Sequence, residues 1–146
     1  MIAFLGLAFS VKSQTISRPT IYEGKLGKGV HNVKFLDDDK ILFIYQNPSY
    51  HYANVLDLIS FALPDIDNAI ALTNKILVIL NMDETDKNVS IEDTFIDLRL
   101  FRNGKYQQEV YVWAPNVSMG CPFKKEATIK LKMALLEAKS KMNNSK

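Results

Sequence analysis

At 146 residues the chain has the length of one domain and can bury a core without disulfides. Its 47% hydrophobic and 23% charged residues are typical of a globular protein, and a formal net charge of +2 is too small to indicate nucleic-acid binding. No segment reaches the roughly 18 apolar residues that a membrane-spanning helix requires. We therefore expect one globular domain, with no nucleic-acid partner and no membrane span.

The first 13 residues have features of a signal peptide. Their apolar run has the length of a signal-peptide core, and Ser13 is a small residue at a suitable cleavage point. No Lys or Arg precedes the run, however, so a core strand is the alternative. We expect removal of residues 1–13, a single domain over residues 14–146, and a periplasmic or extracellular location. The core-strand alternative corresponds to a cytoplasmic protein. Cleavage would lower the formal charge from +2 to +1, because Lys12 is lost.

The next elements are predicted as strands at residues 20–24, 31–36 and 41–45. The last of these is continuously apolar and bounded by turns, which is typical of a central strand. The nearby Gly24, Gly27 and Gly29 lack the spacing of a phosphate-binding loop, so we interpret them as part of a hairpin connection.

The acidic turn at residues 37–40 lacks the spacing of a calcium loop, and we interpret it as solvated. Residues 50–62 are predicted to be extended. A helix is then predicted from Pro64-Asp65 to about Asn81, with Asp65 and Asp67 stabilising its positive end.

The clearest local signal is a β-hairpin over residues 94–102 and 105–113. Both segments alternate between apolar and polar residues, and the intervening Asn103-Gly104 favours a two-residue type I′ turn. That turn predicts three facing pairs: Arg102 with Lys105, Phe101 with Tyr106, and Asp97 with Val110.

One face of the hairpin is more apolar than the other, and we assign the more apolar face to the core. It carries Ile96, Leu98, Leu100, Tyr111 and Trp113. The opposite face, expected to be partly solvated, carries Phe95, Asp97, Arg99, Phe101, Tyr106, Gln108, Val110 and Val112.

A second helix is predicted over residues 122–142, with Pro122 in its first turn and Cys121 near its N-cap. Its main apolar stripe consists of Ala127, Leu131, Ala134, Leu135, Ala138 and Met142, and a narrower one consists of Ile129, Met133 and Leu136. Two stripes predict two contacts. One contact is with the sheet, and the other is with the first helix, a partner protein or a second copy.

Cys121 is the only cysteine and the strongest single candidate for a catalytic residue. At a helix N-terminus its pKa would fall, and His31 or His51 could then serve as a base. A lone cysteine is more often a small buried residue, and no catalytic signature surrounds this one. The two histidines belong to no metal-spaced cluster, so we expect neither a metal site nor a cofactor.

Three aromatic residues are candidates for ligand contacts: Tyr50, Tyr52 and Trp113. The two tyrosines could stack on a sugar if they share an exposed face, although cross-strand packing also explains them.

These patterns together predict an α+β fold: an antiparallel sheet of about five strands with two helices on one face, in the order ββ(β)α–ββα. Because no catalytic residues cluster, the favoured function is a small exported, non-enzymatic module that binds a partner protein or itself. The alternatives are a cysteine-dependent hydrolase or thiol enzyme using Cys121, and a carbohydrate-binding surface at Tyr50 and Tyr52.

Overall fold

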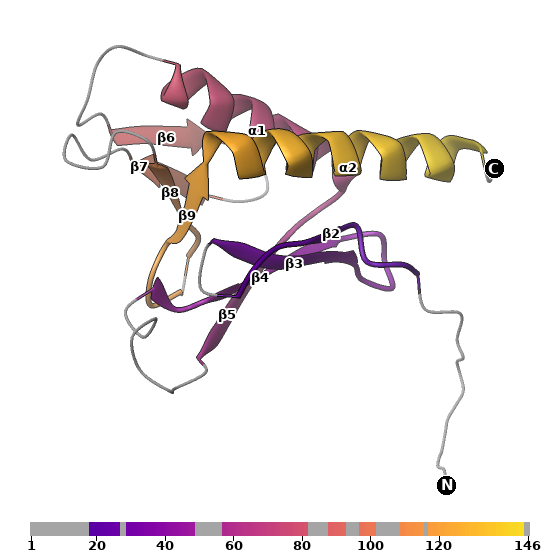
Figure 1. The fold of residues 1–146 in the computed structure, drawn as a ribbon, viewed down its shortest axis with the longest axis horizontal. Coiled ribbons are helices and arrows are strands. Elements are labelled where there is room, and N and C mark those ends of the chain that lie inside the picture. The colour runs from indigo at the N-terminus through magenta and orange to yellow at the C-terminus, as the bar shows by residue number, and fades with distance from the viewer. Residues whose placement is uncertain are drawn as a thin grey trace, which may run out of the picture.

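The computed structural model describes residues 18–26, 29–48, 57–81, 88–92, 97–101, 109–115 and 117–144, and for 88–92 and 97–101 it describes the backbone alone. These residues form eight strands and two helices (Figure 1). The predicted α+β class is confirmed. In place of one sheet of about five strands, the described strands form two antiparallel sheets of four. Each sheet is followed by a helix, so the order is four strands and a helix, twice.

The N-terminal sheet is a meander with strand order β2-β3-β4-β5. Its strands are β2 (Tyr22–Glu23), β3 (Val30–Phe35), β4 (Ile41–Gln46) and β5 (Leu58–Leu63). The central position predicted for residues 41–45 is confirmed, and Ile41, Phe43 and Tyr45 are fully buried. Phe43 lies opposite Phe61 in the ladder, and the two rings stack with their centroids 4.9 Å apart.

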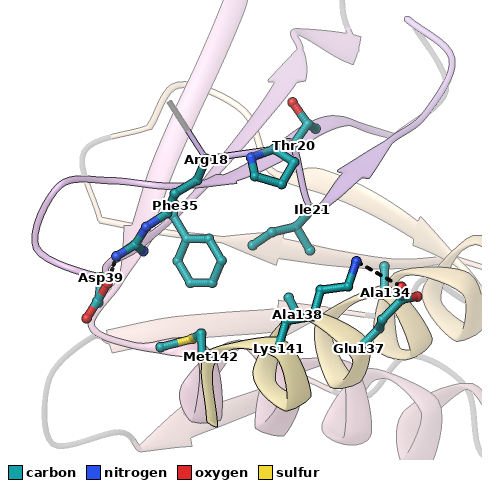
Figure 2. A pocket seen from close by; sticks show the side chains of 11 residues that line it. Arg18, Thr20, Ile21, Phe35, Asp39, Ala134, Glu137, Ala138, Lys141 and Met142 are labelled. Atoms are coloured by element: carbon teal, nitrogen blue, oxygen red, sulfur yellow. Dashed lines mark ion pairs between the residues drawn. The ribbon is translucent and has the colours of Figure 1, made fainter. Parts of the chain in front are cut away.

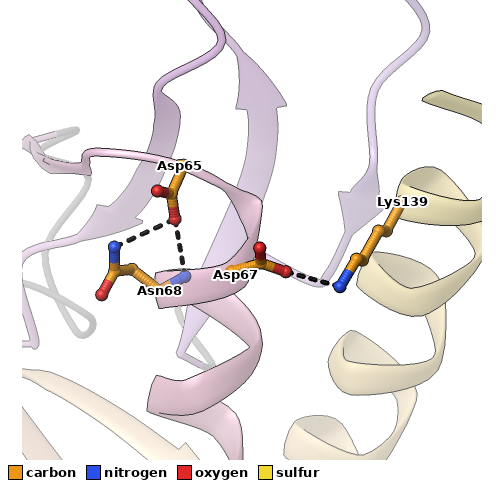
Figure 3. Close-up of polar contacts among 4 residues, drawn as sticks. All are labelled: Asp65, Asp67, Asn68 and Lys139. Atoms are coloured by element: carbon orange, nitrogen blue, oxygen red, sulfur yellow. Dashed lines mark hydrogen bonds and ion pairs between the residues drawn. The ribbon is translucent and has the colours of Figure 1, made fainter. Parts of the chain in front are cut away.

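Helix α1 (Ile66–Leu80) confirms the helix predicted over this segment. Asp65 is its N-cap: a carboxylate oxygen accepts a 2.8 Å hydrogen bond from the backbone N–H of Asn68 and a 2.9 Å bond from its side-chain amide (Figure 3). The buried side of α1 follows the helical period that the sequence predicts. It consists of Ile66, Ala69, Leu72, Thr73, Ile76 and Ile79.

The C-terminal sheet has the order β6-β7-β8-β9. Its strands are β6 (Asn88–Glu92), β7 (Asp97–Phe101), β8 (Glu109–Trp113) and β9 (Cys121–Lys124). The predicted antiparallel pairing of the two hairpin segments is present in β7 and β8. Their register differs from the prediction: Phe101 lies opposite Tyr111 and not Tyr106. In the same register Asp97 does not face Val110, so that predicted pair is wrong as well, whereas the predicted pair of Arg102 with Lys105 lies outside the described residues.

The face assignment in β8 is also wrong. Val110 and Val112 are fully buried, whereas Tyr111 is half-buried and Trp113 is exposed. The residue opposite Phe101 is at position 111 and not at position 106, which is a shift of five residues. Because side chains alternate between the two faces of a strand, an odd shift reverses the faces of one strand relative to the other. The core takes the two β-branched valines instead of the larger, amphipathic rings. The predicted core residues Ile96, Leu98 and Leu100 lie outside the described side chains.

Residues 121–124 also differ from the prediction, because they form strand β9 and not the first turn of a helix. Cys121 pairs with Val112 and Phe123 with Val110. Cys121 and Phe123 are both buried, and their spacing of two residues fits a strand. Pro122 is tolerated because β9 lies at the edge of the sheet. Helix α2 therefore begins at Lys125 and ends at Asn144.

The two helices lie side by side on one side of the N-terminal sheet (Figure 1). Helix α1 contacts β5 and β8, and helix α2 contacts β2 and β9, so each helix touches both sheets. The buried apolar side chains form one cluster to which both sheets and both helices contribute. The two four-stranded units therefore share a single core.

Glycine is required where the two sheets meet. Gly29 has a φ of +99°, and a Cβ there would lie 2.8 Å from the carbonyl oxygen of Pro122 in β9. A side chain at this position would combine backbone strain with a clash.

The N-cap of α1 yields a stability prediction. Asp65→Ala removes the acceptor of the Asn68 N–H and is expected to lower the free energy of unfolding by about 1 kcal/mol. The matched control is Asp67→Ala, which keeps the cap but loses an exposed ion pair with Lys139 of α2 (2.7 Å, Figure 3) and a favourable charge in the first turn, and it should cost less, about 0.5 kcal/mol. Urea denaturation of both variants checks this order, and equal losses would contradict the capping role.

Candidate functional site

An open groove of about 580 Å³ lies between the N-terminal sheet and the C-terminal half of α2 (Figure 2). Its apolar walls come from Ile21 and Phe35 on one side and from Ala134, Ala138 and Met142 on the other. The main apolar stripe predicted for the second helix thus covers two surfaces. Leu131 and Leu135 are buried in the core, whereas Ala134, Ala138 and Met142 line the groove.

The charged residues at the rim of this groove pair with one another. The Arg18 guanidinium lies 2.5 Å from an Asp39 carboxylate oxygen, and its carbon stands 4.6 Å from the centroid of the Phe35 ring. On the helix side, Lys141 Nζ lies 3.2 Å from Glu137 Oε2 (Figure 2). Each cation therefore has a carboxylate beside it, and the rim offers no excess charge of either sign to a ligand.

The second surface feature is the outward face of α2. Ile129 is 39% exposed, Met133 66% and Leu136 45%. Their spacings of four and three residues align them along one line of the helix, which we call the outer stripe. Val78 of the adjacent α1 is also exposed. The narrower stripe seen in the sequence is thus present on the helix, and all three of its side chains are exposed.

Cys121 lies in the core and not at a helix end. Its side chain is fully buried on β9, and burial raises the pKa of the thiol well above its usual value. Its Sγ lies 3.8 Å from the carbonyl oxygen of Pro122. The predicted N-cap position, which would have lowered the pKa, is wrong, and a buried protonated thiol is a poor nucleophile. The geometry gives no support to the thiol-enzyme hypothesis.

The other candidate chemical groups have structural surroundings. The Nδ1 atom of His31 lies 3.2 Å from the carbonyl oxygen of Gly24, within the β2–β3 hairpin. Asp38 pairs with Lys40 in the turn before β4, and Asp39 pairs with Arg18. Among the described residues, no group of three or more His, Cys, Asp or Glu side chains is arranged to hold a metal ion.

The three aromatic candidates are not brought together. Tyr50, Tyr52 and His51 lie outside the described residues. Trp113 is 36% exposed and packs against the turn before β9, where a Cβ on Gly120 would lie 2.7 Å from the indole. Trp113 does not line the groove.

No pattern in the sequence predicts the groove itself. Its walls come from the first described strand region and the last helix, and neither segment carries a pattern that indicates the other. The outer stripe, by contrast, was visible from helical spacing alone.

Comparison with protein-family models, with curated proteins and with solved structures finds no match to this chain. In the part of the chain that the structure describes, neither helix is long and apolar enough to cross a membrane.

The buried thiol generates a pH prediction. Because folding raises the pKa of Cys121, its contribution to stability is fully present below the unfolded pKa of about 9 and is lost as the pH rises further. The free energy of unfolding should fall by up to about 1.4 kcal/mol per pH unit between pH 9 and 10, since one proton is lost only on unfolding. Cys121→Ala should remove this component of the slope. Urea titrations at each pH check it, and identical slopes in the two proteins would contradict it.

Proposed function

We propose that this chain is a small exported, non-enzymatic module that binds protein through the outward face of α2. The observation that carries the proposal is the outer stripe of Ile129, Met133 and Leu136. Isolated exposed apolar residues are normal on any protein, but three aligned on one helix make a continuous apolar strip. An amphipathic helix face of this kind commonly fits another helix or an apolar surface.

The surrounding residues support recognition of a protein over a small molecule. The strip lies on a convex helix surface and none of its residues lines the groove, whereas small ligands are bound in concave pockets that enclose most of their surface. The neighbouring groove is concave, but its charged rim is self-paired. The exposed Glu126, Lys130 and Glu137 lie beside the stripe on the outward side of α2 and provide a polar rim.

The non-enzymatic part of the proposal rests on the described side chains that could carry chemistry. Cys121 is buried and protonated, and His31 lies beside a backbone carbonyl within a hairpin. Neither residue lines the groove. Export rests on the apolar start of the chain and on Ser13.

Site-specific photo-crosslinking tests the binding surface. A benzoylphenylalanine placed at position 133 in the native host should yield covalent products with protein after irradiation, because that side chain is exposed at the centre of the stripe. The matched control is the same group at Lys34, an exposed position on β3. Equal yields at the two positions, or no product at position 133, would count against the proposal.

Mass spectrometry of the mature protein in each cell fraction tests export. We expect the species outside the cytoplasm to begin at Gln14, after loss of the 13 residues that end with Ser13. An intact Met1 in the cytoplasmic fraction alone would contradict export and would leave the binding surface to be judged by the crosslinking result.

A further inference from the structure

Two features of the outward face of α2 indicate which kind of protein would bind there. One is the outer stripe. The other is a row of four exposed charged residues beside it, Glu126, Lys130, Glu137 and Lys141, which we call the charge row. Spacings of four, seven and four residues place these four on one side of the helix.

The signs in the charge row alternate from the N-terminal to the C-terminal end: negative, positive, negative, positive. Reversing the direction of the helix inverts every sign. An antiparallel copy of α2 therefore presents a cation opposite each carboxylate, and a carboxylate opposite each cation.

A single register satisfies all four positions. Lys130 and Glu137 are equidistant from the midpoint between Met133 and Ala134, and so are Glu126 and Lys141. A two-fold axis at that midpoint pairs Lys130 with Glu137 of the second copy, and Glu126 with Lys141. In an antiparallel pair about such an axis, the same edge of both helices lies on the same side of the interface. The charge row of one helix therefore faces the charge row of the other.

The outer stripe fits the same arrangement. Its spacings of four and three residues are those of a coiled-coil seam, and Lys130 and Glu137, each one residue after a residue of the stripe, take the same flanking position beside it. The axis brings Met133 next to its own copy and places Ile129 near Leu136 of the second helix. Apolar contacts would then lie in the centre and ion pairs at the edge that carries the charge row. The opposite edge carries Lys125, Lys132 and Lys139, of which Lys139 already pairs with Asp67 of its own chain.

We infer that the partner of the outer stripe is a second copy of this chain, bound through antiparallel pairing of α2 about a two-fold axis near Met133. This inference rests on the proposed function. Glu137 and Lys141 now pair with each other, but their side chains are 68% and 71% exposed, so exchanging this pair for intermolecular ones costs little.

The contact is limited in area. Helix α2 has 20 residues and is about 30 Å long, and a single helix face covers less than the roughly 800 Å² per partner of a standard interface. We therefore expect a weak dimer that dissociates on dilution, which suits a module that assembles when its local concentration rises.

Charge reversal tests the register. In sedimentation analysis of the purified mature protein, Lys130→Glu and Glu137→Lys should each weaken dimerisation about tenfold or more, because each places like charges opposite each other twice. The double variant Lys130→Glu/Glu137→Lys should dimerise again, since the reversed row is still complementary to its own copy. An equal mixture of the two single variants should form the heterodimer. Circular dichroism controls for folding, and all four positions of the row are exposed.

Disulfide trapping tests the position of the axis. Met133→Cys should form a covalent dimer on mild oxidation, because the axis passes beside this residue. The matched control is Ser140→Cys, which the same axis separates from its copy by 13 residue rises, or about 20 Å, well beyond disulfide reach. Cys121 is buried and does not compete.

The outcomes separate this inference from the proposed function. A dimer that Lys130→Glu does not weaken, or a Ser140→Cys dimer as abundant as the Met133→Cys dimer, would overturn the antiparallel pairing. A strictly monomeric protein that still crosslinks to a different protein at position 133 would overturn self-association and leave the proposed function standing. A monomer without crosslinks at position 133 would remove both.

Discussion

The side chain of Tyr45 joins the two halves of the molecule. Its ring is fully buried in the N-terminal sheet, edge-on to Phe61 at 6.2 Å, and its hydroxyl donates a hydrogen bond to the carbonyl of Met119, 74 residues further along the chain. Burial, with a smaller effect from the neighbouring Cys121, raises the pKa of this hydroxyl, so it remains a donor. A buried hydroxyl without a partner is costly. This hydrogen bond therefore ties the packing of the N-terminal sheet to the turn before β9.

This dependence explains why two four-stranded units make one domain. Each sheet has an apolar face that needs a cover, and the covering layer of α1 and α2 is shared between them. A helix that belonged to one sheet alone would leave the other half of the core open to water. The residues of α2 are correspondingly divided. Thr128, Leu131 and Leu135 are buried in the core, Ala134, Ala138 and Met142 line the groove, and Ile129, Met133 and Leu136 are exposed.

The features that the sequence predicted correctly are those set by neighbouring residues. The helix start at Pro64-Asp65, the central strand at residues 41–45 and both helix stripes depend on local spacing. The errors concern partners that are distant in the chain. Asn103-Gly104 favoured a tight turn, but burial of Val110 and Val112 decided the register. Pro122 resembled a helix start, but pairing of Cys121 with Val112 made it part of an edge strand. The groove depends on contact between opposite ends of the described chain, which no local pattern records.

That contact between the chain ends has a topological consequence. Arg18 and Met142 line the same groove, so the first and last described elements finish close together at the surface. The passage from α1 to β6 connects two units of equal order, each with four strands and a helix. A circular permutant that joined Asn144 to Arg18 by a short linker and opened the chain between Asn81 and Asn88 would exchange the order of the two units and preserve every described strand neighbour. The order of the two units along the chain is thus set by their connection alone, and the same core contacts would form in either order.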